Sequence, residues 1–245
     1  MGARVSQPLW RRWLSYLVEI HIESAPSEVN RHLYVSLSRG RYQLSTKNAV
    51  YSYADLYSNY RRTFETLDWE QMPRPAHVLL LGVGLCSIPY MLEYTFGKRY
   101  VYTGVEIDEH VLYLASKYVI PQLGAPVTLV HADGYDFVLH NTREFDIVCM
   151  DIFIDDTTPD KFESDEFLDG LRRATGQEGI VLYNCLAQSK RDKAQTQTFL
   201  HEQFLPVFPQ GGYLDVGGNW MLVSDRTKLV STKDRHSKRS RPQLR

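Results

Sequence analysis

From residue 77 onward the chain alternates short apolar runs with stretches of helical periodicity, and this alternation most constrains its fold. The run 78–81 contains no polar residue, and four later runs of similar length follow it. Strands that are apolar throughout are buried on both faces, and helices between them imply parallel βαβ units. The expected strands are 78–81, 100–105, 127–130, 145–150 and 180–183, and the expected helices end near 96 or span 109–118, 135–140 and 164–174.

The first 75 residues follow a different pattern. Apolar and polar residues alternate over 16–22 and again over 33–37, as in half-buried strands. Residues 38–40 (Ser-Arg-Gly) predict a turn, and 41–46 can return as its partner strand. We therefore expect an N-terminal extension over 1–14, a small antiparallel β domain with a linking helix (53–67) over 15–75, an α/β domain over 76–225 and a basic disordered tail over 226–245.

Composition is that of an ordinary soluble protein. Hydrophobic residues make up 43% of the 245 positions and charged residues 23%. No window approaches the roughly 18 apolar residues that a membrane span needs. The N-terminus has no signal-peptide pattern, and three cysteines without a CxxC pair fit a reducing compartment. We therefore expect a cytoplasmic protein with no membrane partner.

Charge is unevenly distributed along the chain. Residues 225–245 hold eight Lys or Arg against two Asp, whereas the whole chain has a net charge of −1. A solvated tail is the favoured interpretation, and an arm for nucleic acid is the alternative that we do not favour. The acidic remainder favours a cationic substrate. The histidines show no ligand spacing with cysteines or acids, so no metal is expected.

Gly82 and Gly84 directly follow the first of the buried strands, at the place where folds of this kind bind ligands. Glycine lets the backbone turn sharply and approach a ligand closely, although a tight turn alone also uses glycine. Ser87 stands where a dinucleotide-binding loop has its third glycine. The loop, which continues through Leu85, therefore favours a ligand other than NAD.

Acids follow the next two strands. Glu106, with Ile107 after it, lies 24 residues past Gly82, where a carboxylate can accept hydrogen bonds from both ribose hydroxyls. Asp133 ends the following strand and can accept from an adenine amine, while Gly134 frees the backbone. The alternatives are a solvent-facing acid for Glu106 and a helix cap for Asp133. Together the three loops fit an adenosine moiety, so we expect a Rossmann-like fold of the S-adenosylmethionine methyltransferase type behind the small β domain.

With these loops in place, the chain resembles the spermidine synthase family of aminopropyltransferases, especially its divergent prokaryotic members, over about residues 15–225. The resemblance implies that Asp151 is catalytic and that Tyr53 and Asp55 close the site over a small amine such as putrescine. It also implies decarboxylated S-adenosylmethionine as co-substrate, and it leaves a homo-oligomer open. The matching motifs are the Tyr-x-acid segment at 53–55, Gly82 and Gly84, Glu106 in Val-Glu-Ile-Asp, Asp133-Gly134 and the strand 145–150 that ends at Asp151.

The chain departs from the family pattern at two places. Leu85 stands where the family has the Asp that holds the amine of the transferred group, and Cys86 stands where it has a further glycine. The second acid of the family's gate is displaced by at least one residue here, to Asp155 or Asp156. The resemblance therefore supports the fold and the adenosyl site more closely than it supports polyamine synthesis.

Aminopropyl transfer needs a neutral amine beside the carbon that is bonded to sulfur. Alkyl amines are protonated at pH 7, with a pKa of about 10. The site must therefore bind the cation and then remove a proton, and carboxylates do both. We expect Asp151 to be the base and Asp155 or Asp156 to orient the distal ammonium. A strand-end cap is the alternative for Asp151, and a solvated acidic loop is the alternative for the other two.

Three functions remain open from the sequence. The first is an aminopropyltransferase that uses decarboxylated S-adenosylmethionine and a diamine. The second is a methyltransferase that uses S-adenosylmethionine itself, which the leucine at position 85 suits because an acid there would oppose the methionine carboxylate. The third is a non-catalytic protein that binds the adenosyl group.

Overall fold

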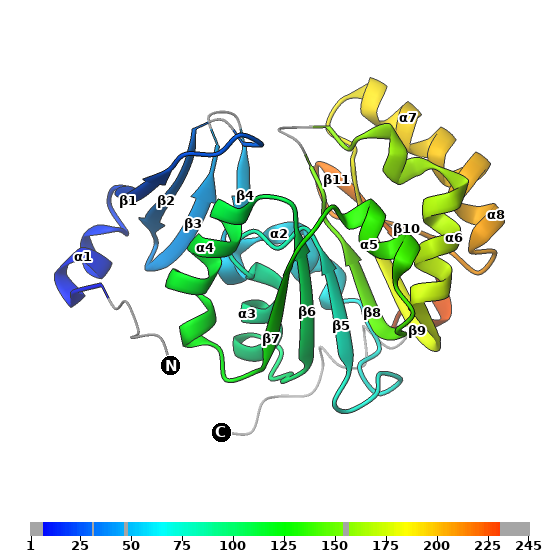
Figure 1. The fold of residues 1–245 in the computed structure, drawn as a ribbon, viewed down its shortest axis with the longest axis horizontal. Helices are drawn as coiled ribbons and strands as arrows, with labels where there is room; N and C mark the ends of the chain where they lie inside the picture. Colours follow the sequence, from blue (N-terminus) through cyan, green and yellow to red (C-terminus); the bar gives the residue numbers. More distant parts are fainter. Residues whose placement is uncertain (1–6, 31, 47–48, 154–156, 231–245) are drawn as a thin grey trace, which may run out of the picture.

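The computed structural model describes residues 7–30, 32–46, 49–153 and 157–230. A small sheet and a larger seven-stranded sheet carry the fold, with helix α4 between them in Figure 1. The larger sheet has the order β10-β11-β9-β8-β5-β6-β7, in which β9 through β7 run parallel, and this confirms the expected α/β class. Its strands are β5 (His77–Leu81), β6 (Val101–Glu106), β7 (Val127–His131), β8 (Phe145–Met150), β9 (Thr175–Leu186), β10 (Gly212–Asp215) and β11 (Asn219–Val223).

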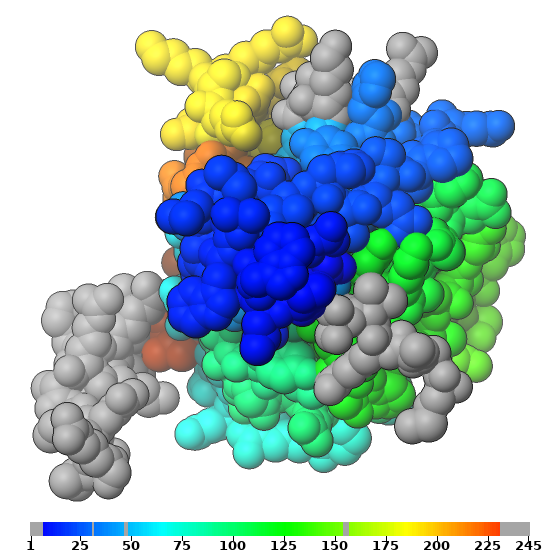
Figure 2. Space-filling model, turned by 90° about the vertical axis from the view of Figure 1, so that its left-hand side faces the viewer, coloured from blue at the N-terminus to red at the C-terminus, as the bar shows by residue number. Residues whose placement is uncertain are grey.

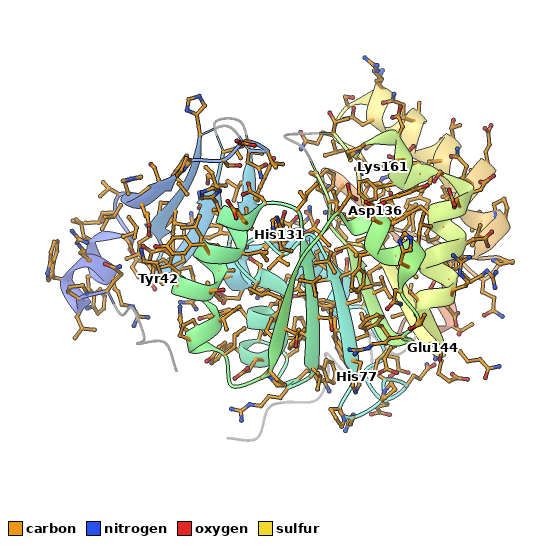
Figure 3. All side chains as sticks on the ribbon, viewed as in Figure 1. Tyr42, His77, His131, Asp136, Glu144 and Lys161 are labelled. Carbon is orange, nitrogen blue, oxygen red and sulfur yellow. The ribbon has the colours of Figure 1, made fainter. Side chains whose placement is uncertain are left out.

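The chain changes direction across this sheet at β5. From β5 it adds β6 and β7 on one side and then crosses back to place β8 on the other side. The carboxyl ends of these strands therefore meet at a topological switch point, where open α/β sheets bind their ligands. Figure 3 shows His131 and Lys161 toward this edge, whereas His77 and Glu144 lie at the opposite edge. The candidate site residues directly follow strands of this sheet, so they lie at the carboxyl edge, the one that holds His131.

Helices cover both faces of the seven-stranded sheet. Tyr60, Phe64 and Met91 pack on one face, and Phe167 and Phe199 pack on the other. Buried aromatic side chains of this size dominate the apolar contribution to such a core. The first face carries α2 (Ser58–Phe64) and α3 (Ser87–Tyr94), and the second carries α5 (Gly134–His140), α6 (Asp165–Ala174), α7 (Lys190–Phe199) and α8 (Leu205–Val207).

The small antiparallel sheet packs directly on α4 (Glu109–Tyr118) and shares a core with it. Leu33 and Val35 of the sheet and Leu114 of the helix belong to one apolar cluster, which also holds Val83 and Leu85 of the glycine loop. The small sheet is therefore fixed next to that loop. Its strands, in spatial order, are β1 (Ile20–Ala25), β2 (Leu33–Ser38), β3 (Arg41–Ser45) and β4 (Val50–Ser52), and α1 (Leu9–Leu14) precedes them on the face shown in Figure 2.

Asp108 ties the small sheet to α4. Its side chain is buried, and its Oδ1 accepts from the backbone N of His110, which caps α4. Its Oδ2 accepts from Ser27 Oγ at 2.5 Å and from Asn30 Nδ2 at 2.7 Å. One carboxylate therefore begins a helix and also holds the loop before β2 against it.

Replacing Asp108 with Ala should lower the free energy of unfolding by about 2–3 kcal/mol. Loss of the cap costs about 1 kcal/mol, and the donors at Ser27 and Asn30 lose a charged acceptor. Urea denaturation measures the difference. The control is Asp169→Ala, which removes an exposed ion pair with Arg172 and should change stability by less than about 0.5 kcal/mol. Equal losses in the two variants would contradict the role given to Asp108.

Two expected elements near the N-terminus begin later than the sequence predicts. The strand expected over 16–22 is β1, Ile20–Ala25, because Val18 N bonds to Leu14 O and residues 16–18 are exposed turns after α1. The helix expected over 53–67 is α2, Ser58–Phe64, because Ala54 has a φ of +46° and Tyr57 is extended. A positive φ at a non-glycine residue interrupts a right-handed helix.

The chain beyond 183 adds elements that the sequence pattern did not predict, namely α7, α8, β10 and β11. The first residues of the expected disordered tail are also ordered. Asp68 N bonds to Lys228 O, and Val230 N bonds to Thr66 O, so 226–230 pack beside the segment after α2. The rest of the tail, 231–245, lies outside the described residues. Within the described part of the chain, no helix has the length and apolar character that crossing a membrane requires.

Candidate active site

Two adjoining cavities lie at the carboxyl edge of the large sheet. The larger, of about 430 Å³, is bounded by β4 of the small sheet, the glycine loop and the ends of β9 and β11. The smaller, of about 100 Å³, reaches Asp133 and Gly134. Gly82, Glu106 and Asp151 line both cavities. The structure therefore brings together the residues that the sequence selected from four separate strand ends.

The glycine loop is shaped by close backbone approaches. Gly82 has a φ of +85°, and a Cβ there would lie 2.4 Å from the carbonyl oxygen of Asp151. Gly84 has a φ of +50°, and its Cβ would lie 3.0 Å from Ser52 Cβ. Leu85 does not line either cavity: it is 1% exposed and packs in the cluster below α4, while its N donates to Ser52 Oγ. Leu85 therefore offers no side chain to either cavity.

Glu106 is held by three backbone amides. Its Oε2 accepts from Val83 N at 3.1 Å, and its Oε1 accepts from Ile107 N at 3.0 Å and from Asp108 N at 3.1 Å. A carboxylate has about four acceptor positions, so roughly one remains for a ligand hydroxyl. Burial raises its pKa, and the three amides oppose that rise. The alternative of a purely solvent-facing acid does not describe this residue.

Asp133 and Ile107 lie beside the smaller cavity. Asp133 Oδ1 accepts from Tyr135 N at 2.8 Å and caps α5, while its Oδ2 pairs with Lys161 Nζ. The cap that the sequence offered as the alternative is therefore present, together with the position at the cavity. Ile107 is exposed, and its carbonyl oxygen contacts His131 Nε2 at 2.9 Å. Contact of either residue with adenine stays a prediction.

Asp151 follows β8 and is positioned by two donors on one of its oxygens. Tyr57 Oη donates to Oδ1 at 3.0 Å, and Asn184 Nδ2 donates to the same atom at 2.8 Å. Among the described residues no hydrogen bond is found at Oδ2, and contact of this oxygen with a substrate stays a prediction. Burial raises the pKa of Asp151 to about 6, and the bonds from Asn184 and Tyr57 oppose that rise. A carboxyl with this pKa can exchange a proton near neutral pH.

Tyr53 and Asp55, the residues expected to close the site, do not line these cavities. Tyr53 Oη bonds to Ser38 Oγ at 2.8 Å, and Asp55 pairs with Arg41 at 2.6 Å, both within the small-sheet region. Tyr57, four residues after Tyr53, is the aromatic side chain that reaches Asp151. Asp155 and Asp156 lie outside the described residues, so their expected role stays a prediction.

Sequence reasoning missed Tyr57, Asn184 and Asn219, all of which line the larger cavity. Tyr57 is the third tyrosine of residues 51–57, and the sequence carries no signal that separates it from Tyr53. Asn184 comes at the end of the strand predicted over 180–183, as Asp151 does after its own strand, and position at a strand end could have identified it. Asn219 opens β11, for which no strand was predicted. Among the described residues, no group of three His, Cys, Asp or Glu is arranged to hold a metal.

Comparison with known proteins identifies the family of this chain. Residues 66–209 match the family model of the spermine/spermidine synthase domain. The chain belongs to this spermine/spermidine synthase family. A probable polyamine aminopropyl transferase of Bifidobacterium longum is 29% identical over 106 residues, which are 43% of this chain and 23% of that protein. The match thus spans about a quarter of the curated relative's length.

Solved structures share the fold at low identity. A probable spermidine synthase from Corynebacterium glutamicum superposes with a TM-score of 0.65 at 17% identity, covering 89% of this chain and 85% of that one. Spermidine synthase from Thermotoga maritima gives 0.59 at 16% identity, covering 83% and 72%. Human methyltransferase-like protein 13, solved in complex with SAH, gives 0.54 at 21% identity, covering 70% and 85%. The fold is therefore common to spermidine synthases and to methyltransferases.

Proposed function

We propose that this member of the spermine/spermidine synthase family transfers an aminopropyl group from decarboxylated S-adenosylmethionine to a small amine such as putrescine, forming spermidine. The observation that carries the proposal is the state of Asp151, a half-buried carboxyl with one oxygen fixed by two donors and the other left for a substrate. Family membership supports the reaction class.

The cavity walls fit the adenosyl end of such a co-substrate. Glu106 keeps one acceptor position for a ribose hydroxyl, and Gly82 keeps the loop free of a side chain beside Asp151. Asp133 would meet the adenine amine from the smaller cavity, in exchange for part of its contact with Lys161. Ile107 and Gly134 would form the apolar edges around the base. When bound, the sulfonium supplies an electrophilic carbon and a neutral thioether leaving group.

Asp151 acts as the base in the transfer. Its Oδ2 first binds the ammonium of the amine, then takes one proton, which frees the nitrogen lone pair. The nitrogen–carbon bond forms as the carbon–sulfur bond breaks, and the bonding electrons leave with the sulfur of methylthioadenosine. Tyr57 and Asn184 hold Oδ1 during this step, so the carboxylate stays aimed into the cavity.

The burial of Leu85 favours methyl transfer from S-adenosylmethionine as a second candidate. The glycine loop offers no carboxylate to the transferred amine, because Leu85 packs into the core. Because no acid stands at that position, the methionine carboxylate of the undecarboxylated cofactor would meet no like charge there. A non-catalytic protein that binds the adenosyl group is the third candidate. An assay that detects no turnover with either sulfonium would favour it.

Thermal shift with the two sulfoniums distinguishes the candidates. A ligand that binds the native state stabilises it by RT ln(1 + [L]/Kd), so a tenfold preference is visible as a difference in Tm. We expect decarboxylated S-adenosylmethionine to stabilise the chain more than S-adenosylmethionine does at equal concentration. A larger shift with S-adenosylmethionine would favour methyl transfer instead.

The pH dependence of turnover should reflect Asp151. The base must be ionised, so kcat/KM is expected to fall as pH drops through about 6, the pKa to which burial raises this carboxyl. Initial rates between pH 5 and 8.5 measure the acid limb. A limb near pH 4, the ordinary range of an exposed aspartate, would contradict the assignment.

A further inference from the structure

A chain of carboxamides runs behind Asp151 across three neighbouring strands. Asn219 Nδ2, at the start of β11, donates to Asn184 Oδ1 on β9 at 3.0 Å. Asn184 Nδ2 donates in turn to Asp151 Oδ1, after β8, at 2.8 Å. Asn184 is 2% exposed and Asn219 is 7% exposed, so water competes little for these bonds. Buried polar groups of this kind are costly unless each bond is made, which gives the chain one preferred arrangement.

The direction of every bond in this chain is set by Asp151. An ionised carboxylate only accepts hydrogen bonds, so Asn184 must turn its NH₂ group toward it. The carbonyl oxygen of Asn184 then faces Asn219, which must donate. If the side chain of Asn219 is removed, the carboxamide of Asn184 can rotate by half a turn and present its oxygen to Asp151 instead. That arrangement favours a protonated acid, which is no base.

We propose that Asn219 is a positioning residue: it locks Asn184 as a donor to Asp151 and so keeps the carboxylate ionised for catalysis. The inference deepens the proposed function and rests on it for the role of Asp151. Asn219 lies beyond residues 66–209, the part of the chain that matches the family model. The lock therefore includes a strand, β11, outside the part of the chain that the family model matches.

The tyrosine and cysteine groups around Asp151 stay neutral in the same pH range. Burial raises the pKa of the Tyr57 hydroxyl and of the Cys149 thiol, so both stay neutral near pH 7. Tyr60 is likewise neutral, and its hydroxyl donates to the carbonyl oxygen of Met150. Glu106 faces the same cavity with its three backbone donors. The groups around Asp151 are thus Tyr57, Tyr60, Glu106, Cys149 and Asn184. The neutral Tyr57 hydroxyl can donate or accept by turning its O–H bond, whereas the carboxamide of Asn184 must rotate as a whole, and its bond from Asn219 opposes that rotation.

The test replaces Asn219 with Leu, which has nearly the same size and no donor. We expect the pKa of Asp151, followed by the carboxyl ¹³C resonance of labelled aspartate, to rise by at least about one pH unit, a tenfold change in the proton dissociation constant. Asp151→Asn identifies the resonance. The acid limb of kcat/KM should move up by the same amount, with rates recovering at pH 8.5. Asn219→Ala serves if the leucine variant does not fold.

A double-mutant cycle separates positioning from a general loss of structure. If Asn219 acts through Asn184, then Asn184→Leu shifts the titration as Asn219→Leu does, and the double variant shifts it no further. Thr196→Val is the matched control: Thr196 is also 7% exposed and also bonds β9, at Leu186 O, but among the described residues it has no bond to Asp151, Asn184 or Asn219. It should leave the titration unmoved.

The outcomes are distinct. An unmoved Asp151 titration in Asn219→Leu and Asn219→Ala, or additive shifts in the double variant, overturns the inference. A wild-type chain that turns over no amine, yet shows the shift and its non-additivity, overturns the proposed function and leaves the lock standing. The titration needs no turnover, so the two failures cannot be confused.

Discussion

Asp151→Asn should reduce aminopropyl transfer by at least about 100-fold, the usual contribution of a general base. The substitution keeps the shape of the side chain. Tyr57 and Asn184 both donate to Oδ1, which asparagine retains, and the change falls on Oδ2, the oxygen expected to take the proton. Steady-state rates with saturating sulfonium measure the loss. Cofactor binding should stay within a few-fold of wild type, because the change removes a step that comes after binding.

The loss in Asp151→Asn should not come from unfolding. The folded-state pKa of Asp151 lies above the ordinary value of 3.8, at about 6. Its stabilising contribution is therefore complete below about pH 4 and is lost as pH rises through 6. The asparagine variant should consequently be at least as stable as wild type at pH 7.5. The control is Asp146→Asn. Asp146 lies on the same strand at the opposite edge of the sheet, where it accepts from His77 N. This variant should keep wild-type turnover.

Glu106→Gln should weaken the binding of methylthioadenosine by about 10- to 100-fold. A hydrogen bond to an ionised group contributes about 1.5–3 kcal/mol. The amide also places an NH₂ group against a backbone donor, either Val83 N or the pair Ile107 N and Asp108 N, so the loop itself is disturbed. Isothermal titration calorimetry with methylthioadenosine measures this effect without any amine chemistry.

The control for that experiment is Glu109→Gln. Glu109 is exposed in the first turn of α4, three residues from Glu106, and lines neither cavity. Its amide variant should bind methylthioadenosine with the wild-type Kd. Equal binding by Glu106→Gln and wild type would place the ribose elsewhere and remove the basis for the adenosyl site.

The sequence predicted the strands of the large sheet well because their apolar runs are fixed by burial on both faces. Gly82, Glu106 and Asp151 were predictable for the same reason: each directly follows such a run, and the ends of parallel strands meet at one edge. Asp133 was ambiguous in the sequence and shows both features in the structure, a helix cap and a place at the smaller cavity.

The residues that the sequence could not predict depend on details without a periodic signal. Tyr57 reaches Asp151 because Ala54 takes a positive φ and Tyr57 itself is extended, which delays the start of the expected helix to Ser58. Nothing in the residue types of that segment distinguishes Tyr57 from Tyr53. Asn219 enters the site only because β11 pairs with β9 in an antiparallel register, a contact between segments more than thirty residues apart.

The central claim is that the cavity joins an adenosyl sulfonium to an amine by means of Asp151. Its most direct test is to incubate the chain with decarboxylated S-adenosylmethionine and putrescine and to quantify products by mass spectrometry. Methylthioadenosine and spermidine should appear in equal amounts, and Asp151→Asn should yield about 1% or less of either. Failure to release methylthioadenosine would contradict the account. So would release of S-adenosylhomocysteine in a parallel incubation that contains S-adenosylmethionine instead of the decarboxylated form.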